Sequence, residues 1–188
     1  MIVIDFETTG LEGIEAGDRI VEIGVADVDF ERKTVTGMFG APMDIDLTEA
    51  EAESWIFSEG YMSPAECDHS PIDESKGASI LAAIIDGEYV TSFNTEFDID
   101  KFLIPWFDRI IPDALDICFF RAPCIMKASA QITPNNVWPT LNTAYATLCG
   151  GYRKLREHRA MDDAVKAGRV MLELYNRGLY DPDREDEY

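Results

Sequence analysis

The chain has 188 residues and a formal net charge of −20, and 46% of its residues are hydrophobic. This length and apolar content fill the core of one ordinary domain and exclude a wholly disordered chain. No apolar run approaches the ~20 residues of a membrane span, and Met1 to Asp5 lack the basic region and cleavage site of a signal peptide. Four cysteines without a C-x-x-C pair predict free thiols in a reducing cytoplasm, rather than a zinc knuckle.

Charge is distributed unevenly along the chain. Residues 1–60 hold 3 basic and 15 acidic groups, whereas residues 119–180 hold 9 basic and 4 acidic groups, a local charge of +5. Phosphate binding usually goes with a basic surface, so the overall charge argues against nucleic acid as a partner. The basic stretch could still hold a polyanion locally, and a chance cluster on an acidic surface is the alternative. Its centre is a histidine bracketed by Arg153, Lys154, Arg156 and Arg159.

The first third of the chain predicts strands. Residues 2–6 form a short run rich in β-branched residues that ends at Thr-Thr-Gly, as expected of a buried strand entering a turn. Residues 19–30 alternate in polarity with one slip, which predicts a half-buried strand with a bulge near residues 24–26. Residues 33–43 are expected to pair back with it as a hairpin.

Helical signals begin at Thr48, a threonine cap followed by acidic residues. Residues 57–76 are rich in Ser, Pro, Gly and Asp, which predicts a long loop. A short helix over residues 79–85, a strand over 88–93 and a helix over 97–110 are expected to follow. Pro105 must kink or end the last of these, because proline lacks the N–H that a helix interior needs.

The remainder of the chain predicts one more strand and then helices. The strand is expected over residues 114–118, a helix over 140–148, and a long final helix from Ala160 to Tyr175, where apolar residues follow the 3.6-residue period. Residues 1–180 are therefore predicted to form one α/β domain with helices packed on a sheet. Residues 181–188 form an acidic tail that is expected to fray.

Two carboxylates end the first predicted strand, in the sequence D-F-E-T-T-G at residues 5–10. Residues i and i+2 of a strand face the same side, so Asp5 and Glu7 project together while Phe6 points into the covered face. Adjacent like charges are costly unless a cation lies between them, and hard oxygen ligands suit Mg²⁺ or Mn²⁺. Two exposed acids at a strand end are the alternative.

A second candidate, Asp98, follows the strand predicted over residues 88–93, in the sequence N-T-E-F-D at 94–98. It falls in the first turn of a helix, where the helix dipole and the free amides favour an anion. Asn94 and Thr95 are both good N-caps, so a plain capping region explains this segment equally well.

The third candidate segment holds His158 and Asp163, in the sequence H-R-A-M-D-D-A at residues 158–164. On an ideal helix, five residues correspond to ~140° around the axis, so these two side chains cannot share a helix face. They converge only if His158 lies in the loop before the helix and Asp163 lies on the helix. A histidine beside arginines is more often an ordinary surface residue, but this one is one of only two in the chain.

These three motifs, with W-P-T-L-N-T-A-Y at residues 138–145, resemble the DEDDh branch of the DnaQ-like exonucleases. That family includes proofreading subunits of replicative DNA polymerases and RNase T-like trimming enzymes. The resemblance spans residues 2 to about 175. The DEDDy branch would place a tyrosine at Arg159, so the DEDDh branch is favoured, and the motif spacing selects Asp163 over its neighbour Asp162.

The resemblance implies an RNase H-like α/β fold with a central mixed five-stranded sheet flanked by helices. It implies two divalent ions, Mg²⁺ or Mn²⁺, held by Asp5, Glu7, Asp98 and Asp163. His158 is implied as the general base that takes a proton from the attacking water, since imidazole accepts protons near neutral pH. The implied reaction is 3′→5′ hydrolysis of DNA or RNA, with release of nucleoside 5′-monophosphates.

The resemblance also implies contacts to the terminal nucleotide. Single-stranded 3′ ends are the expected partner, because the acidic chain lacks the many basic contacts that hold a long duplex. The sequence leaves open DNA or RNA as substrate, and a homodimer or a polymerase or repair partner. The implied substrate-binding residues are Thr8, Gly10, Leu11 and Asn94.

Three aromatic residues that border residues 57–76 could stack a base, with core or loop packing as the alternative: Trp55, Phe57 and Tyr61. Two non-enzymatic readings compete with the exonuclease reading. An inactive binding module with this fold is disfavoured because all four acids and the histidine are present. A metal-storing protein is disfavoured because no D-x-D-x-D-G loop occurs.

Overall fold

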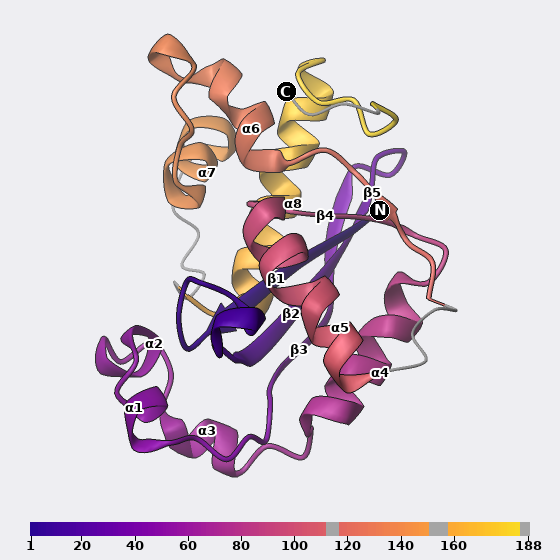
Figure 1. Cartoon of the computed structure of the whole chain (residues 1–188). Helices are drawn as coiled ribbons and strands as arrows, with labels where there is room; N and C mark the ends of the chain where they lie inside the picture. The colour runs from indigo at the N-terminus through magenta and orange to yellow at the C-terminus, as the bar shows by residue number, and fades with distance from the viewer. Residues whose placement is uncertain (112–116, 151–157, 185–188) are drawn as a thin grey trace.

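The structure is a computed structural model that describes residues 1–111, 117–150 and 158–184 (Figure 1). Five strands form one mixed sheet in the order β3-β2-β1-β4-β5. The pairs β1–β2 and β2–β3 are antiparallel, whereas β1–β4 and β4–β5 are parallel. The predicted mixed five-stranded sheet is confirmed. The strands are β1 (Ile2–Thr8), β2 (Ile20–Asp29), β3 (Thr34–Pro42), β4 (Tyr89–Ser92) and β5 (Phe120–Arg121).

The helices vary widely in length, and α8 is the longest of those described. None of the helices in the described residues has the length and apolar character that crossing a bilayer requires. The α-helices are α1 (Glu49–Ala52), α2 (Trp55–Ser58), α3 (Pro64–Asp68), α4 (Glu74–Ile85), α5 (Ile104–Ile110), α6 (Ile125–Ser129), α7 (Leu141–Cys149) and α8 (Ala160–Asn176). A π-helix, η2 (Glu96–Leu103), precedes α5, and the 3₁₀ turns are η1 (Ile14–Ala16), η4 (Ala130–Ile132) and η5 (Pro134–Asn136).

Alternation along β1 divides the core between the two faces of the sheet. Ile2, Ile4 and Phe6 of β1 belong to a buried cluster with residues of α4, η2 and α5. Val3 belongs to a second buried cluster with residues of α6, α7 and α8. Because side chains alternate, Asp5 and Glu7 share the side of Val3, which is the side that α8 covers. Phe6 points into the opposite core, as predicted.

The pairing shifts where the bulge was predicted, but the extra residue is Met38 of β3 and not a residue of the second strand, so the predicted position is right and the predicted strand is wrong. The register of β2 against β3 shifts between Val25 and Ala26, within the predicted span. A further shift between Glu7 and Thr8 interrupts the pairing of β1 with β2, directly after the second acid. Glu7 pairs with Glu22 and Thr8 with Ile20, so the extra residue is Val21 of β2, and the bend that a bulge introduces falls on β2 beside the acidic pair.

The long loop predicted over residues 57–76 is wrong. This stretch contains all of α3, and α4 begins within it at Glu74. The residues that suggested a loop instead cap the helices. Ser63 and Glu66 form a capping box around Pro64 in the first turn of α3, and the Asp73 side chain accepts from the backbone N–H of Lys76. Such caps satisfy the free N–H groups at a helix start, which lets short polar segments become helical.

The last strand is also displaced from its prediction. β5 is Phe120–Arg121, held to β4 by the N–H of Phe120 on the carbonyl of Glu88 at 2.8 Å and the N–H of Ala122 on Val90 at 2.9 Å. Residues 117–118 lie outside any strand, and residues 114–116 of the prediction lie outside the described residues. The pairing is set by the partner strand rather than by the apolar run that suggested residues 114–118.

Pro105 changes the type of its helix instead of ending it. The chain is a π-helix through Leu103 and an α-helix from Ile104, with Pro105 in the first turn of α5. Proline fits there because the first turn of an α-helix needs no N–H donor at that position. The π-helical turns before it carry Asp98 beneath the end of β1.

Candidate active site

One cavity of about 470 Å³ opens at the carboxyl end of β1 and receives residues from five separate segments of the chain. Its walls include every residue predicted as catalytic, metal-binding or substrate-binding. A volume of this size lies within the range of small-ligand sites, about 300–1,000 Å³. The predicted residues that line it are Asp5, Glu7, Thr8, Gly10, Leu11, Asn94, Asp98, His158 and Asp163.

The strand pairing of β1 places the first two acids. Asp5 is opposite Gly24 of β2 and Glu7 is opposite Glu22, so the acidic pair faces an additional carboxylate across the sheet. Glu7 is buried, with 6% of its surface exposed, and Asp5 is half-buried. Burial first, and then the neighbouring acids Asp163 and Glu22, raise the pKa of Glu7 to about 9.

Asp98 reaches the same cavity from η2. Its side chain is buried, and Oδ1 accepts a hydrogen bond from the backbone N–H of Phe6 at 3.3 Å. Burial raises the pKa of Asp98 to about 7, although this hydrogen bond favours the charged form. The bond also ties η2 to β1 between the first two acids.

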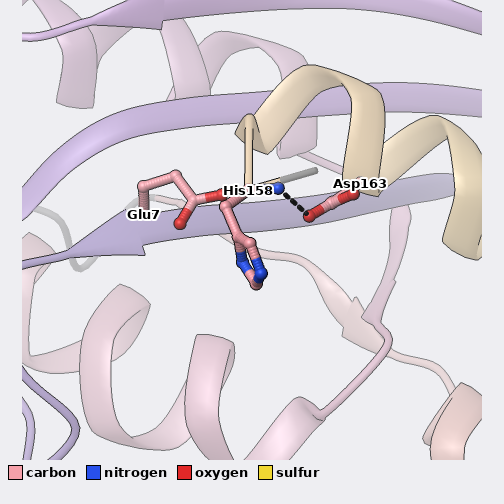
Figure 2. A group of neighbouring side chains, drawn as sticks. All are labelled: Glu7, His158 and Asp163. Atoms are coloured by element: carbon pink, nitrogen blue, oxygen red, sulfur yellow. Dashed lines mark hydrogen bonds between the residues drawn. The ribbon is translucent and has the colours of Figure 1, made fainter. Parts of the chain in front are cut away.

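His158 and Asp163 meet in the way that the helical geometry demands. His158 lies before α8, with φ of 54°, and Asp163 lies in the first turn of that helix. The backbone N–H of His158 donates to Oδ2 of Asp163 at 3.2 Å (Figure 2). Ligand atoms of Glu7, His158 and Asp163 all lie within 4.8 Å of one another. The predicted loop-then-helix arrangement is confirmed.

Burial and mutual repulsion make it costly for the acids at this site to be ionised at the same time. Burial, followed by the charges of Asp98 and Asp163, raises the pKa of Asp5 well above its usual range. Burial also raises the pKa of Asp163, against the ammonium of Lys166, which makes a close ion pair with Oδ1 of Asp163. Four convergent carboxylates that resist ionisation together are a donor set that fits hard divalent cations, because a cation removes the repulsion.

An ion-pair network that the sequence did not predict lies beside the acids. Arg159 donates to both carboxylate oxygens of Glu22, with a shortest distance of 2.6 Å, and to Oε1 of Glu66 at 2.9 Å. Glu22 is 4% exposed and also accepts from the backbone N–H of Ala160 at 2.9 Å. Its one indication in the sequence is Glu22, an acid inside the apolar run of β2 that pairs opposite Glu7.

The start of α8 lies directly on the backbone of β2. A Cβ atom at Gly24 would lie 2.0 Å from the carbonyl carbon of Ala160. Any larger residue would therefore push the helix away from the strand. Since Asp163 is in the first turn of α8, this contact fixes how far that acid lies from Asp5, the cross-strand partner of Gly24.

The loop after β1 is held in shape by polar contacts. Thr8 Oγ1 donates to the carbonyl of Gly10 at 2.7 Å, and a Cβ atom at Gly10 would lie 2.2 Å from Oδ1 of Asp18. The Lys101 ammonium donates to the carbonyl of Leu11 at 3.0 Å. Leu11 itself is 69% exposed at the edge of the cavity. An apolar side chain is thus presented to solvent on a fixed backbone.

The three aromatic residues proposed to stack a base have different surroundings. Phe57 is buried in the core and does not line the cavity. Trp55 lines the cavity and is 51% exposed, and Tyr61 is partly buried. The rings of Trp55 and Tyr61 both pack on the imidazole of His158. Three members of the basic cluster, at positions 153, 154 and 156, lie outside the described residues.

Comparisons with known proteins agree with this geometry. The model of the RNase_T family, described as exonuclease, matches residues 2–171. E. coli exonuclease I in complex with a dA16 oligonucleotide has a TM-score of 0.68 at 17% identity, covering 96% of this chain and 42% of that chain. Its zinc-bound form with single-stranded DNA gives 0.66 at 18%, covering 94% and 40%.

A third solved structure is similar over its full length. The nuclease domain of 3′hExo, a DEDDh family member bound to rAMP, has a TM-score of 0.68 at 14% identity, covering 98% of this chain and 96% of that chain. The chain spans about two fifths of the exonuclease I chains. A comparison with curated proteins found no match. The predicted RNase H-like exonuclease fold is confirmed, and the chain belongs to the RNase_T exonuclease family.

Proposed function

We propose that the protein is a divalent-metal-dependent 3′→5′ exonuclease of the DEDDh type. It hydrolyses the terminal phosphodiester of single-stranded DNA or RNA and releases nucleoside 5′-monophosphates. The observation that carries this proposal is the convergence of four carboxylates and one histidine on a single cavity. These residues are all the metal ligands and the general base that the resemblance implied, and they come from the beginning, the middle and the last third of the chain.

The metal-binding residues in this proposal are Asp5, Glu7, Asp98 and Asp163. Their all-oxygen donor set and their raised pKa values support this role, since both call for a hard cation. A pair of bound Mg²⁺ or Mn²⁺ ions supplies charge stabilisation for the attacking and leaving oxygens.

His158 acts as the general base and removes a proton from the attacking water. Its ring lies beside the acids rather than among the core residues, with a nitrogen within 4.8 Å of carboxylate oxygens of Glu7 and Asp163. The bond from its backbone N–H to Asp163 supports this role, because it fixes the base relative to a proposed metal ligand.

The substrate end is held by the loop after β1. Thr8, Gly10 and Leu11 present backbone and one exposed apolar side chain to the terminal nucleotide, and Asn94 faces it from the end of β4. The net charge of −20 favours a short single strand, because binding by counterion release needs many basic contacts. The similar structures of exonuclease I in complex with a dA16 oligonucleotide and of the 3′hExo nuclease domain bound to rAMP support single strands and nucleotides as ligands.

Residues 1–180 form the exonuclease domain in this proposal. Tyr180 supports that boundary, because it is buried and its hydroxyl donates to the carbonyl of Pro123 at 2.9 Å. Residues 181–184 follow it as a polar segment, and residues 185–188 lie outside the described residues.

The reaction is tested with single-stranded DNA and RNA of the same sequence, each labelled at the 5′ end. Incubation with Mg²⁺ or Mn²⁺ should shorten the labelled strand one nucleotide at a time, and a chelator should stop this. Release of labelled mononucleotide at the first time point would instead indicate attack from the 5′ end. The ratio of DNA and RNA rates assigns the substrate.

Variants connect the reaction to the cavity. Asp5→Asn with Glu7→Gln, and separately Asp98→Asn, should abolish the reaction, whereas Asp162→Asn is the matched control beside the proposed ligand Asp163. Equal losses in Asp162→Asn and Asp98→Asn would contradict the assignment. A folded wild-type protein that leaves both polymers intact with either metal would overturn the proposed function.

A further inference from the structure

The imidazole of His158 lies against two aromatic rings that come from far away in the sequence. Its centroid is 4.7 Å from the ring of Trp55, in an edge-to-face arrangement at 89°, and 4.2 Å from the ring of Tyr61, at 57°. The two aromatic rings also contact each other at 5.0 Å. The three rings therefore form one cluster. The two separations that involve Trp55 lie in the range of favourable aromatic pairs, about 4.5–7 Å, and the rings of Tyr61 and His158 are closer still.

The backbone of His158 is in a conformation that non-glycine residues rarely adopt. Its φ of 54° is in the left-handed region. Such a conformation costs on the order of 1–3 kcal/mol and persists only where the surroundings impose it. At His158 those surroundings are the hydrogen bond to Asp163 on one side and the rings of Trp55 and Tyr61 on the other.

The next residue is held by the same part of the chain. Glu66 of α3 accepts from Nη1 of Arg159 at 2.9 Å through Oε1, while its Oε2 accepts from the backbone N–H of Ser63 at 2.8 Å. One carboxylate thus joins Arg159 to the capping box of α3. Residues 55–68, which run from the start of α2 to the end of α3, contact both His158 and Arg159, and are grouped at the lower left of Figure 1.

The same residues are anchored in the core, so they can hold a neighbour still. Ile56, Phe57, Met62 and Cys67 are all buried in the cluster that packs on the even-numbered face of β1. These four side chains are buried, while Trp55 and Tyr61 contact the imidazole of His158 and Glu66 accepts a hydrogen bond from Arg159. Residues 55–68 are thus packed into the core on one side and contact His158 or Arg159 through three side chains on the other, so they can support the start of α8.

We propose that residues 55–68 act as a clamp that positions His158 for proton transfer. Trp55 and Tyr61 fix the direction of the imidazole, and Glu66 fixes the backbone after it through Arg159. The clamp rests on the proposed function, in which His158 is the general base. Tyr61 is a positioning residue, since it touches the imidazole and does not line the cavity.

Tyr61 therefore offers the cleanest test in metal-loaded protein with a single-stranded substrate. Tyr61→Ala should lower kcat on the order of 10- to 100-fold and leave KM within about twofold, because a displaced base slows the chemical step without removing a substrate contact. Tyr61→Phe keeps the ring and should restore most of kcat. Tyr89→Ala is the matched control, since Tyr89 packs on Phe120 at 5.1 Å, away from the cavity.

A double-variant cycle separates positioning from general damage. If Tyr61 acts through His158, adding Tyr61→Ala to His158→Asn should change kcat by less than about twofold. If the ring merely supports the fold, the two losses should multiply. Multiplied losses, or a wild-type kcat in Tyr61→Ala, would overturn the clamp while leaving the proposed function in place. An inactive wild-type protein would overturn both.

Proton NMR of the imidazole C–H groups tests the clamp in the absence of substrate. The chain has two histidines, so its imidazole C–H groups give two sets of proton signals. Packing against Trp55 and Tyr61 should shift the His158 signal by ring current relative to exposed His69, whose Nδ1 lies 2.8 Å from the carbonyl of Ala65. Tyr61→Ala should move the His158 signal toward that of His69. Unchanged signals would overturn the clamp.

Discussion

His158 and Asp163 are joined through the backbone of the first residue and the side chain of the second. The backbone N–H of His158 donates to Oδ2 of Asp163, so the imidazole takes no part in this hydrogen bond. A change of side chain at position 158 therefore leaves the contact with Asp163 in place. This makes it possible to remove the proposed base while the proposed metal ligand keeps its partner.

His158→Asn is the appropriate variant, because asparagine tolerates the left-handed backbone of this position better than alanine does. We expect kcat to fall by roughly 10²–10⁴-fold, the usual contribution of a general base, with a small change in melting temperature. Steady-state kinetics and thermal unfolding of the metal-loaded protein check this. A kcat within a few-fold of the wild type would remove His158 from the mechanism.

The acidic cluster should make metal-free stability depend on pH in a specific direction. The folded protein holds a proton on Glu7 up to about pH 9, whereas the ordinary pKa of that group is 4.5. Between these values the folded state binds more protons than the unfolded state, so the free energy of unfolding falls as pH rises. The slope reaches at most about 1.4 kcal/mol per pH unit for one such group.

Glu7→Gln isolates that contribution. In chelator, urea unfolding at pH 5, 7 and 9 should show a shallower decline for Glu7→Gln than for the wild type, because glutamine has no proton to lose. Mg²⁺ should flatten the wild-type decline, since a bound cation takes the place of the proton. Parallel declines in the two proteins would contradict the raised pKa of Glu7. The self-repulsion of a chain with net charge −20 acts on both proteins and cancels in the comparison.

Arg159→Ala should be strongly destabilising. It leaves Glu22 buried beside Glu7 without its guanidinium partner, and a buried charge left in this way costs about 3–5 kcal/mol. Chemical denaturation gives the loss directly. Arg32→Ala serves as the comparison, because Arg32 pairs with Asp29 at the surface with 82% of its side chain exposed, and its removal should change stability little.

Two glycines on neighbouring strands should respond differently to the same substitution. A Cβ at Gly24 meets the backbone of Ala160 at 2.0 Å, whereas a Cβ at Gly37 meets the flexible end of the Met161 side chain at 2.6 Å. We expect Gly24→Ala to cost about 3 kcal/mol or more and to lower kcat by displacing Asp163, and Gly37→Ala to cost about 1 kcal/mol. Equal losses of stability and kcat would show that α8 does not rest on the backbone of β2.

Local geometry was sufficient to predict much of the site. Strand alternation placed Asp5 and Glu7 on one side, and helix periodicity required His158 to precede α8. The motifs brought Asp98 to the same place because their order matches a known family. The first two inferences use residues within one segment, where the backbone alone sets the direction of a side chain, whereas the place of Asp98 rests on the family resemblance.

The unpredicted parts depend on contacts between distant segments. Arg159 and Glu22 are 137 positions apart, and nothing local in either segment indicates the other. The α3 helix was read as a loop because its stability comes from caps and from the packing of Cys67, not from an amphipathic period. The aromatic contacts of His158 are not predictable locally either, because Tyr61 is distant in the sequence and lies in the segment predicted as a loop.

The placement of β1 in the middle of the sheet has a consequence for synthesis. β1, β2 and β3 are complete by Pro42, but the face that carries Val3, Asp5 and Glu7 is covered by α8, which ends at Asn176. At about 5–20 residues per second, the intervening 134 residues take roughly 7–27 s to translate. The nascent three-stranded meander therefore spends that time with the face around Val3 uncovered by α8, and its apolar side chains are accessible to other chains in that interval.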